Sequence, residues 1–214
     1  MKKYEFTGEV KQWLGRTLHR IRATVAFGDV KAGDVGGWIE KEDNLDHAGN
    51  AWVCGNARVC DDARVYDGAQ VCGDARVYGN ARVYDGAQVC GDARVYGDAR
   101  VYGDARVYGD ARVYGNAQVY GDAQVYGDAR VCGNAWVYKM SHYLTIGPIG
   151  SRGDFTTFFR TKESEINVAC GCFRGNIEAF EKQVQETHGG NEHAKHYMMA
   201  IEMAKAKIDL SPEE

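Results

Sequence analysis

The long middle part of the chain lacks the side chains on which most enzymes depend. Between Val53 and Tyr138 there is no Ser, Thr, His, Lys or Glu, and both prolines lie after this stretch. Nucleophilic catalysis needs a nucleophile held beside a base, so the usual pairs of this kind are excluded here. We therefore expect a protein that is more a binder than an enzyme, with no catalytic residue, metal or cofactor assigned.

Long hydrophobic runs and a strong charge of one sign are also missing. No apolar run is long enough to span a membrane, and Met1-Lys2-Lys3 leads directly into a polar segment. These features predict a cytoplasmic protein without a signal peptide or a membrane partner. The net charge is −4, and Val53 to Tyr138 holds nine Arg against eleven Asp. A nucleic-acid partner would call for a strongly basic surface, so we do not expect one.

The seven cysteines are odd in number and show no framework spacing, which favours reduced thiols. Cys54, Cys72 and Cys90 recur at a fixed interval of eighteen residues. Side chains stacked at the spacing of neighbouring strands, about 4.8 Å, lie farther apart than the β-carbons of most disulfides. We therefore expect these three thiols to be free.

What the stretch does contain is a strict six-residue period. Fifteen valines run on one grid from Val53 to Val137, and each follows an alanine by two places. In the commonest unit, Ala-Arg-Val-Tyr-Gly-Asp, Ala and Val point inward and Arg and Tyr outward, as expected of a strand with one buried face. Gly-Asp, Gly-Asn or Asp-Gly then supplies a bend, and the same bend every time favours a coil over a meander.

An aliphatic residue followed four places later by a small one, as in Val53 and Ala57, resembles the hexapeptide-repeat proteins. The resemblance implies a left-handed parallel β-helix with three hexapeptides per coil and a homotrimeric assembly. The sequence supports eighteen residues per coil, because Tyr66–Val83 and Tyr84–Val101 are identical except that Asn80 becomes Asp98. We predict a mainly β protein with about five coils.

Stacked coils turn the outward residues into rows. One face carries an arginine row at positions 58, 76, 94, 112 and 130. A second face carries Arg64, Arg82, Arg100, Gln118 and Trp136 beside a tyrosine row, and the third carries the cysteines followed by Tyr108 and Tyr126. The tyrosine row, Tyr66, Tyr84, Tyr102, Tyr120 and Tyr138, is an exposed aromatic stripe of the kind found at interfaces, although outward tyrosines also simply shield a sheet. Corner aspartates such as Asp74, Asp92, Asp110 and Asp128 are the expected partners of the first arginine row.

Composition shifts divide the chain into three segments. Met1–Trp52 is predicted to form strands and a cap that leads into a first irregular coil, Val53–Tyr138 the β-helix, and Lys139–Glu214 a small α/β domain. In the last segment we expect strands over 143–146, 155–161 and 166–170. Asn176 and Asn191 are expected to cap two helices, with His188-Gly189-Gly190 between them.

The segment FGDVKAGDVGGWIEKEDNL followed by GNAWV, together with GPIGSR and CGCFRG near the C-terminus, resembles a family of hexapeptide-repeat proteins encoded by phages and prophages. Its members are commonly labelled transferases from the repeat alone. The resemblance implies a bacterial host cell and no established reaction. Hexapeptide acyltransferases typically place a histidine near the coils, whereas all six histidines here lie outside the repeat.

The Gly147–Gly153 loop is the most suggestive ligand site, because glycines let backbone N–H groups approach a ligand and Arg152 can hold a phosphate or carboxylate. The alternative is a tight connection between strands with Arg152 in a salt bridge. Cys170, Cys172, His193 and His196 have the side chains of a zinc set, but their spacing is not a known zinc signature and favours packed thiols and capping histidines. The candidate ligand-binding residues are Ser151, Arg152, Arg160, His188, Arg76, Arg94 and Arg112.

Three functions remain open from the sequence. The first is a non-catalytic binding protein on a trimeric rod, which sequesters a small anionic ligand such as a nucleotide signal. The second is an acyl- or nucleotidyl-type transferase at subunit interfaces. The third is a structural spacer or protein-interaction module.

Overall fold

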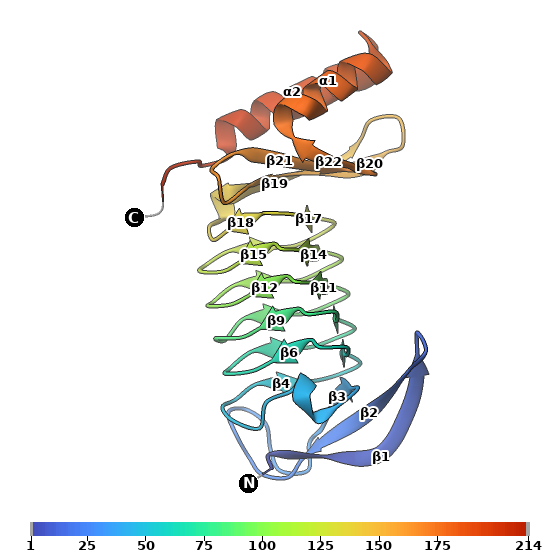
Figure 1. Ribbon diagram of the computed structural model, residues 1–214, viewed down its shortest axis with the longest axis vertical. Helices are drawn as coiled ribbons and strands as arrows, with labels where there is room; N and C mark the ends of the chain where they lie inside the picture. Colours follow the sequence, from blue (N-terminus) through green and yellow to red (C-terminus); the bar gives the residue numbers. More distant parts are fainter. Residues whose placement is uncertain (1, 213–214) are drawn as a thin grey trace.

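The computed structural model describes residues 2–212 and shows an upright β-solenoid with a cap at each end (Figure 1). The alternation of inward Ala and Val with outward polar residues produces three sheets whose coil strands are parallel, and every alanine and valine on the six-residue grid is fully buried. No helix within residues 2–212 is long and apolar enough to cross a membrane.

The first sheet contains a hairpin and one strand from each of six coils. Its order is β1 (Tyr4–Trp13), β2 (Arg16–Ala23), β3 (Val35–Ile39), β5 (Arg58–Val59), β8 (Arg76–Val77), β11 (Arg94–Gly97), β14 (Arg112–Gly115) and β17 (Arg130–Val131). The second sheet contains β4 (Trp52–Val53), β7 (Gln70–Val71), β10 (Gln88–Val89), β13 (Arg106–Val107) and β16 (Gln124–Val125). The third contains β6 (Arg64–Val65), β9 (Arg82–Val83), β12 (Arg100–Val101), β15 (Gln118–Val119) and β18 (Trp136–Val137).

The solenoid therefore has about six turns, which are the five coils predicted over residues 53–138 and the irregular first coil predicted before them. The additional turn begins at β3, where Trp38 pairs in parallel with Arg58 and Ile39 with Val59. The offset from position 38 to 58 is twenty residues, and Leu45 bridges Val65 with the same offset. Trp52 pairs with Gln70 at an offset of eighteen, so the two additional residues of this coil lie between Leu45 and Trp52, after the short 3-10 helix η1 (Glu42–Asn44). The buried Asn44 amide of η1 donates to the carbonyls of Asp61 and Ala63 on the next turn.

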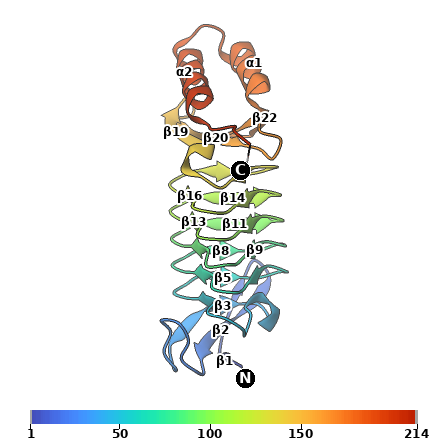
Figure 2. The same ribbon diagram turned by 90° about the vertical axis from the view of Figure 1, so that its left-hand side faces the viewer.

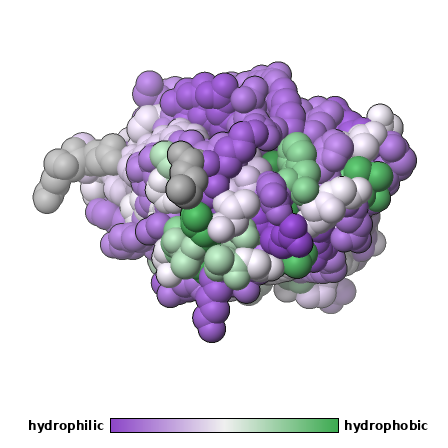
Figure 3. All heavy atoms as spheres, turned by 90° about the horizontal axis from the view of Figure 1, so that it is seen from below, coloured by the Kyte–Doolittle hydropathy of each residue, from purple (hydrophilic) through white to green (hydrophobic). Residues whose placement is uncertain are grey.

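The N-terminal hairpin of β1 and β2 forms the end of the first sheet and reaches along the early coils (Figures 1 and 2). The Trp13 ring sits edge-on to Tyr78 at 6.3 Å, and the guanidinium groups of Arg58 and Arg76 lie 5.5 and 5.9 Å from it. Seen from below, the surface at this end is mostly hydrophilic with small hydrophobic areas (Figure 3). A cap of this kind protects the open end of a solenoid from pairing with other chains.

The C-terminal segment caps the opposite end with an antiparallel sheet. After η2 (Met140–His142), its strands are β19 (Tyr143–Ile149), β20 (Asp154–Arg160), β21 (Ile166–Cys170) and β22 (Phe173–Asn176), followed by α1 (Ile177–His188) and α2 (Glu192–Lys207). The three expected strands, both helices and their caps are confirmed, since Asn176 and Asn191 accept hydrogen bonds from Ala179 and Ala194. The strand β22 was not predicted.

Side chains alternate between the two faces of this sheet, so the sheet contributes residues to two hydrophobic cores. Phe159 and Ala169 join the core of the solenoid, whereas their neighbours Phe158 and Val168 join the core beneath the two helices. Figure 2 shows α1 and α2 side by side on the face of the sheet that points away from the coils. The C-terminal segment is therefore both an end cap and the floor of a separate small core.

The cysteine row differs from the expectation of free thiols. Cys54 and Cys72 form a disulfide with their Cα atoms 4.7 Å apart, whereas Cys90 on the next coil is free. The prediction was wrong because the spacing between coils falls within the Cα separations of about 4.4–6.8 Å that disulfides accept. Burial raises the pKa of the Cys90 thiol, which keeps it protonated at neutral pH.

Reduction of this disulfide is expected to lower the free energy of unfolding by about 3 kcal/mol, because the bond closes a loop whose entropy is restored to the unfolded chain. The two cysteines are separated by 18 residues, so the loop is of the size for which that figure holds. Denaturant unfolding with and without dithiothreitol measures the difference. The Cys90→Ser variant should respond to the reductant as the parent does, and a Cys54→Ser/Cys72→Ser variant should not respond.

Candidate functional site

A pocket of about 340 Å³ lies in the C-terminal domain, where the β19–β20 and β21–β22 turns face the two helices. It brings together three of the residues predicted from the sequence, namely Ser151 and Arg152 from the glycine-rich turn and His188 from the end of α1. The remaining lining residues are Asp154, Cys170, Gly171, Cys172, Phe173, Phe180, Gln183, Val184, Thr187 and Tyr197.

Aromatic rings form one side of this pocket. The Phe173 and Phe180 centroids are 5.1 Å apart, and the Phe180 ring meets the Tyr197 ring edge-on at 5.5 Å. The imidazole of His188 stacks on Tyr197 at 5.7 Å, so four rings form a continuous wall. Burial raises the pKa of the Tyr197 phenol, as does its hydrogen bond with the Cys170 thiol, and Tyr197 therefore lines the pocket as a neutral group.

The glycine-rich turn approaches this wall closely. A β-carbon at Gly150 would lie 1.8 Å from the Tyr197 hydroxyl oxygen, and the residue has a φ of +75°. Only glycine satisfies both conditions. The turn is thus a tight connection between β19 and β20, which was the alternative to a ligand-binding loop. It also forms one edge of the pocket.

The guanidinium of Arg152 has no hydrogen-bond or ion-pair partner within residues 2–212, so the alternative of a structural salt bridge is not seen. The one acid that lines the pocket, Asp154, instead accepts a hydrogen bond from Arg130 of β17 at 3.3 Å. The Arg152 guanidinium is therefore an unpaired cationic donor beside the aromatic wall. This combination suits an anionic ligand that also contains a planar ring.

Arg160 does not line the pocket. Its side chain is buried beneath the C-terminal domain, where it donates to the Tyr138 hydroxyl at 3.3 Å, the Ser164 hydroxyl at 2.7 Å and the Ser211 carbonyl at 3.0 Å. The structure gives this arginine a role in joining the chain end to the last coil.

The arginine row of the first sheet is also separate from the pocket, so Arg76, Arg94 and Arg112 do not meet Ser151. Two of its members lie against Trp13, and Arg130 pairs with Asp154. The corner aspartates expected to neutralise this row form no ion pair with it in the described part of the chain. The tyrosines beside the row, Tyr78, Tyr96 and Tyr114, stack at 4.9 Å.

Arg174 of β22 closes the upper end of that stack by donating to the Tyr114 hydroxyl at 2.8 Å. Burial raises the pKa of Tyr114 to about 12, and the neighbouring Cys132 thiol adds to the shift while Arg174 opposes it. The contact joins the C-terminal domain to the solenoid face. It leaves Tyr78 to Tyr114 with their faces covered by one another, and so unavailable to stack on a base.

The tyrosine row of the third sheet is confirmed as a stack but not as a uniformly exposed stripe. Tyr66, Tyr84, Tyr102 and Tyr120 are half-buried with ring centroids 4.9 Å apart. Tyr138 is only 8% exposed, and its ring packs edge-on against His142 at 4.1 Å. The candidate interface in this chain is therefore the row from Tyr66 to Tyr120.

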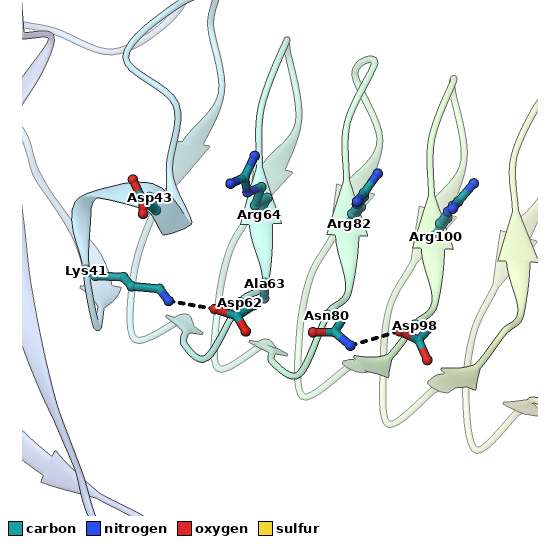
Figure 4. Close-up of a pocket in the computed structure, with 9 residues that line it drawn as sticks. All are labelled: Lys41, Asp43, Asp62, Ala63, Arg64, Asn80, Arg82, Asp98 and Arg100. Atoms are coloured by element: carbon teal, nitrogen blue, oxygen red, sulfur yellow. Dashed lines mark hydrogen bonds and ion pairs between the residues drawn. The ribbon is translucent and has the colours of Figure 1, made fainter.

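A second cavity, of about 450 Å³, lies on the same sheet beside this row and was not predicted. Figure 4 shows Arg64, Arg82 and Arg100 projecting in one line from successive coils, with Asp62, Asn80 and Asp98 in a parallel line beside them. Lys41 and Asp43 complete it at the η1 end. The six-residue grid placed these arginines in one row, but only the structure shows that they border a hollow.

Within residues 2–212 no group of three or more His, Cys, Asp or Glu side chains is arranged to hold a metal ion. Two of the four residues of the candidate zinc set have other contacts. Cys170 accepts a hydrogen bond from Thr156, and the ring of His193 meets that of His188 edge-on at 5.8 Å.

Parallel coils of fixed length with a buried Val and Ala lattice, capped at both ends, define a β-solenoid repeat protein. Its coils match a family model described as YdcK Beta solenoid repeat, in eight segments that together cover residues 51–121 and 123–139. This similarity covers the coils from β4 to β18 and leaves the N-terminal residues 1–50 and the C-terminal domain unmatched. Among curated proteins, no relative matches the chain.

Proposed function

We propose that this protein is a non-catalytic binding protein, in which the β-solenoid is a rigid scaffold and the C-terminal domain holds a small anionic ligand. The observation that carries the proposal is the unpartnered Arg152 guanidinium at the edge of a pocket walled by Phe173, Phe180, Tyr197 and His188. A cationic fork beside an aromatic wall suits a phosphate or carboxylate attached to a planar ring, as in a nucleotide.

In its fuller form, the proposal is that the protein assembles as a homotrimer through the row from Tyr66 to Tyr120. This homotrimer sequesters the ligand inside a phage-infected bacterial cell. Its support is the resemblance of the two ends of the chain to phage-encoded proteins and the half-buried aromatic row on the third sheet. The two alternative functions make different demands. A structural spacer does not require a ligand pocket, and a transferase must convert its substrate to a product.

Native mass spectrometry of the full chain incubated with adenosine monophosphate tests the binding function. We expect a one-to-one complex per chain that Arg152→Gln weakens at least about tenfold, since a charge-assisted hydrogen bond contributes about 1.5–3 kcal/mol. Lys182→Gln is the matched control, because this exposed lysine on α1 pairs with Glu186 away from the pocket. Equal binding by the parent and Arg152→Gln would refute the site. Conversion of the nucleotide to a product would instead favour the transferase.

A further inference from the structure

Arg64, Arg82 and Arg100 form a row of cations on successive coils of the third sheet. All three are exposed, and none has an ion-pair partner within residues 2–212. Carboxylates also line the cavity. Asp62 forms an ion pair with Lys41 at 2.7 Å, and the nearby Arg64 contributes to lowering its pKa. Asp98 accepts a hydrogen bond from the neutral Asn80 amide at 2.9 Å. Asp43 borders the cavity at its η1 end and makes no ion pair there.

The spacing of the row is fixed by the fold. Arg64 pairs in register with Arg82, and the tyrosines two places later on the same coils stack with centroids 4.9 Å apart. Three guanidinium groups therefore repeat at about 4.8 Å and span about 10 Å. Like charges held in register at this distance repel one another, and a bound anion that bridges them relieves that repulsion.

The row is also finite. On the next two coils the register replaces arginine by Gln118 and then Trp136. At the other end η1 closes the cavity with Asp43. A ligand that matches this row is short, linear and carries about three anionic groups.

Aromatic recognition of a base is unfavourable here. The neighbouring Tyr66, Tyr84 and Tyr102 rings are stacked with interplanar angles of 3° and 6°, so their faces are occupied by one another. The site therefore offers guanidinium forks, which match phosphate geometry, and no free aromatic face between the coils.

We propose that Arg64, Arg82 and Arg100 form a binding site for a linear oligophosphate, distinct from the pocket in the C-terminal domain. The chain of phosphoryl groups lies along the solenoid axis, with one guanidinium for each group. The phosphate chain of a nucleoside triphosphate and a free inorganic oligophosphate present the same chemistry to this row.

Isothermal titration of the full chain with inorganic tripolyphosphate tests the proposal. We expect tripolyphosphate to bind at least about tenfold more tightly than orthophosphate, and the affinity to fall with added salt. Replacing the row by glutamine, in R64Q/R82Q/R100Q, should remove this difference. The repeat itself carries Gln70, Gln88 and Gln118 at equivalent places, so the variant should fold.

Matched controls separate this site from other cations. Arg106→Gln, an exposed arginine of the second sheet, and Arg152→Gln should bind tripolyphosphate as the parent does. Adenosine triphosphate should bind with an affinity close to that of tripolyphosphate. Equal affinity for orthophosphate and tripolyphosphate, an unaffected triple variant, or loss of binding in Arg152→Gln would each overturn the proposal. So would adenosine triphosphate that binds tenfold more tightly than tripolyphosphate.

Discussion

Replacing Val107 by Asp is expected to unfold the protein. Val107 of β13 is fully buried and lies in register between Val89 and Val125 of the adjacent coils. A carboxylate there would have no polar partner inside the Ala and Val lattice, and burial of an unpaired charge is among the few single changes that cost more than about 4 kcal/mol. Because each coil is stabilised only by its neighbours, the damage extends to both.

The measurement is circular dichroism with denaturant unfolding of V107D beside Arg106→Asp. The control changes the adjacent residue of the same strand, whose side chain is exposed. It should alter the free energy of unfolding by less than about 1 kcal/mol, within the range of β-propensity and surface effects. A folded V107D of near-parental stability would contradict the inward orientation of the valines.

Replacing Arg160 by Ala is expected to lower the free energy of unfolding by about 3 kcal/mol, because it removes hydrogen bonds from a buried charged group. The lost partners are Tyr138 on the last coil, Ser164 after β20 and Ser211 near the chain end. The guanidinium also lies 5.4 Å from the Tyr138 ring. The change should therefore loosen the C-terminal domain where it meets the solenoid.

Hydrogen exchange read by mass spectrometry locates this effect. Protection should fall in β20 and around residues 208–212 and stay unchanged in the middle coils. Lys162→Ala, an exposed residue 5.5 Å from the Trp136 ring, should leave the pattern intact. Folded R160A protein should still bind adenosine monophosphate. Loss of binding in this variant would show that Arg160 contributes to the ligand site.

Much of the fold could be predicted from the sequence, because the determining interactions are local or periodic. The alternation of Val and Ala with outward polar residues decides which side is buried, and Asn176 and Asn191 cap the two helices within three residues of themselves. The first coil was predicted only as irregular, because β3 joins its neighbour with an offset that the six-residue grid does not show. The strand β22 was missed because Phe173–Asn176 is short and contains a glycine.

The candidate site was predicted only in part, and the reason is again physical. Ser151, Arg152 and His188 meet because α1 folds back over the sheet that the glycine-rich turn belongs to. Arg160 carries the same charge as Arg152, but its position at the end of β20 places it beneath the domain. Residue type indicated anion binding for both, and burial distinguishes them.

The sequence by itself determined the solenoid, since a six-residue period of buried valines repeats one local conformation and stacks each residue on its copy. Only the tertiary structure decided which outward rows stay free. Trp13, Asp154 and Arg174 come from distant segments to cover or pair the arginine and tyrosine rows of the first sheet. The hairpin and the C-terminal domain make these contacts on the first sheet, whereas residues in and around η1 border the row of Arg64, Arg82 and Arg100. Near-identical repeats thus have faces with different chemical properties, because segments from the two ends of the chain contact some faces and not others.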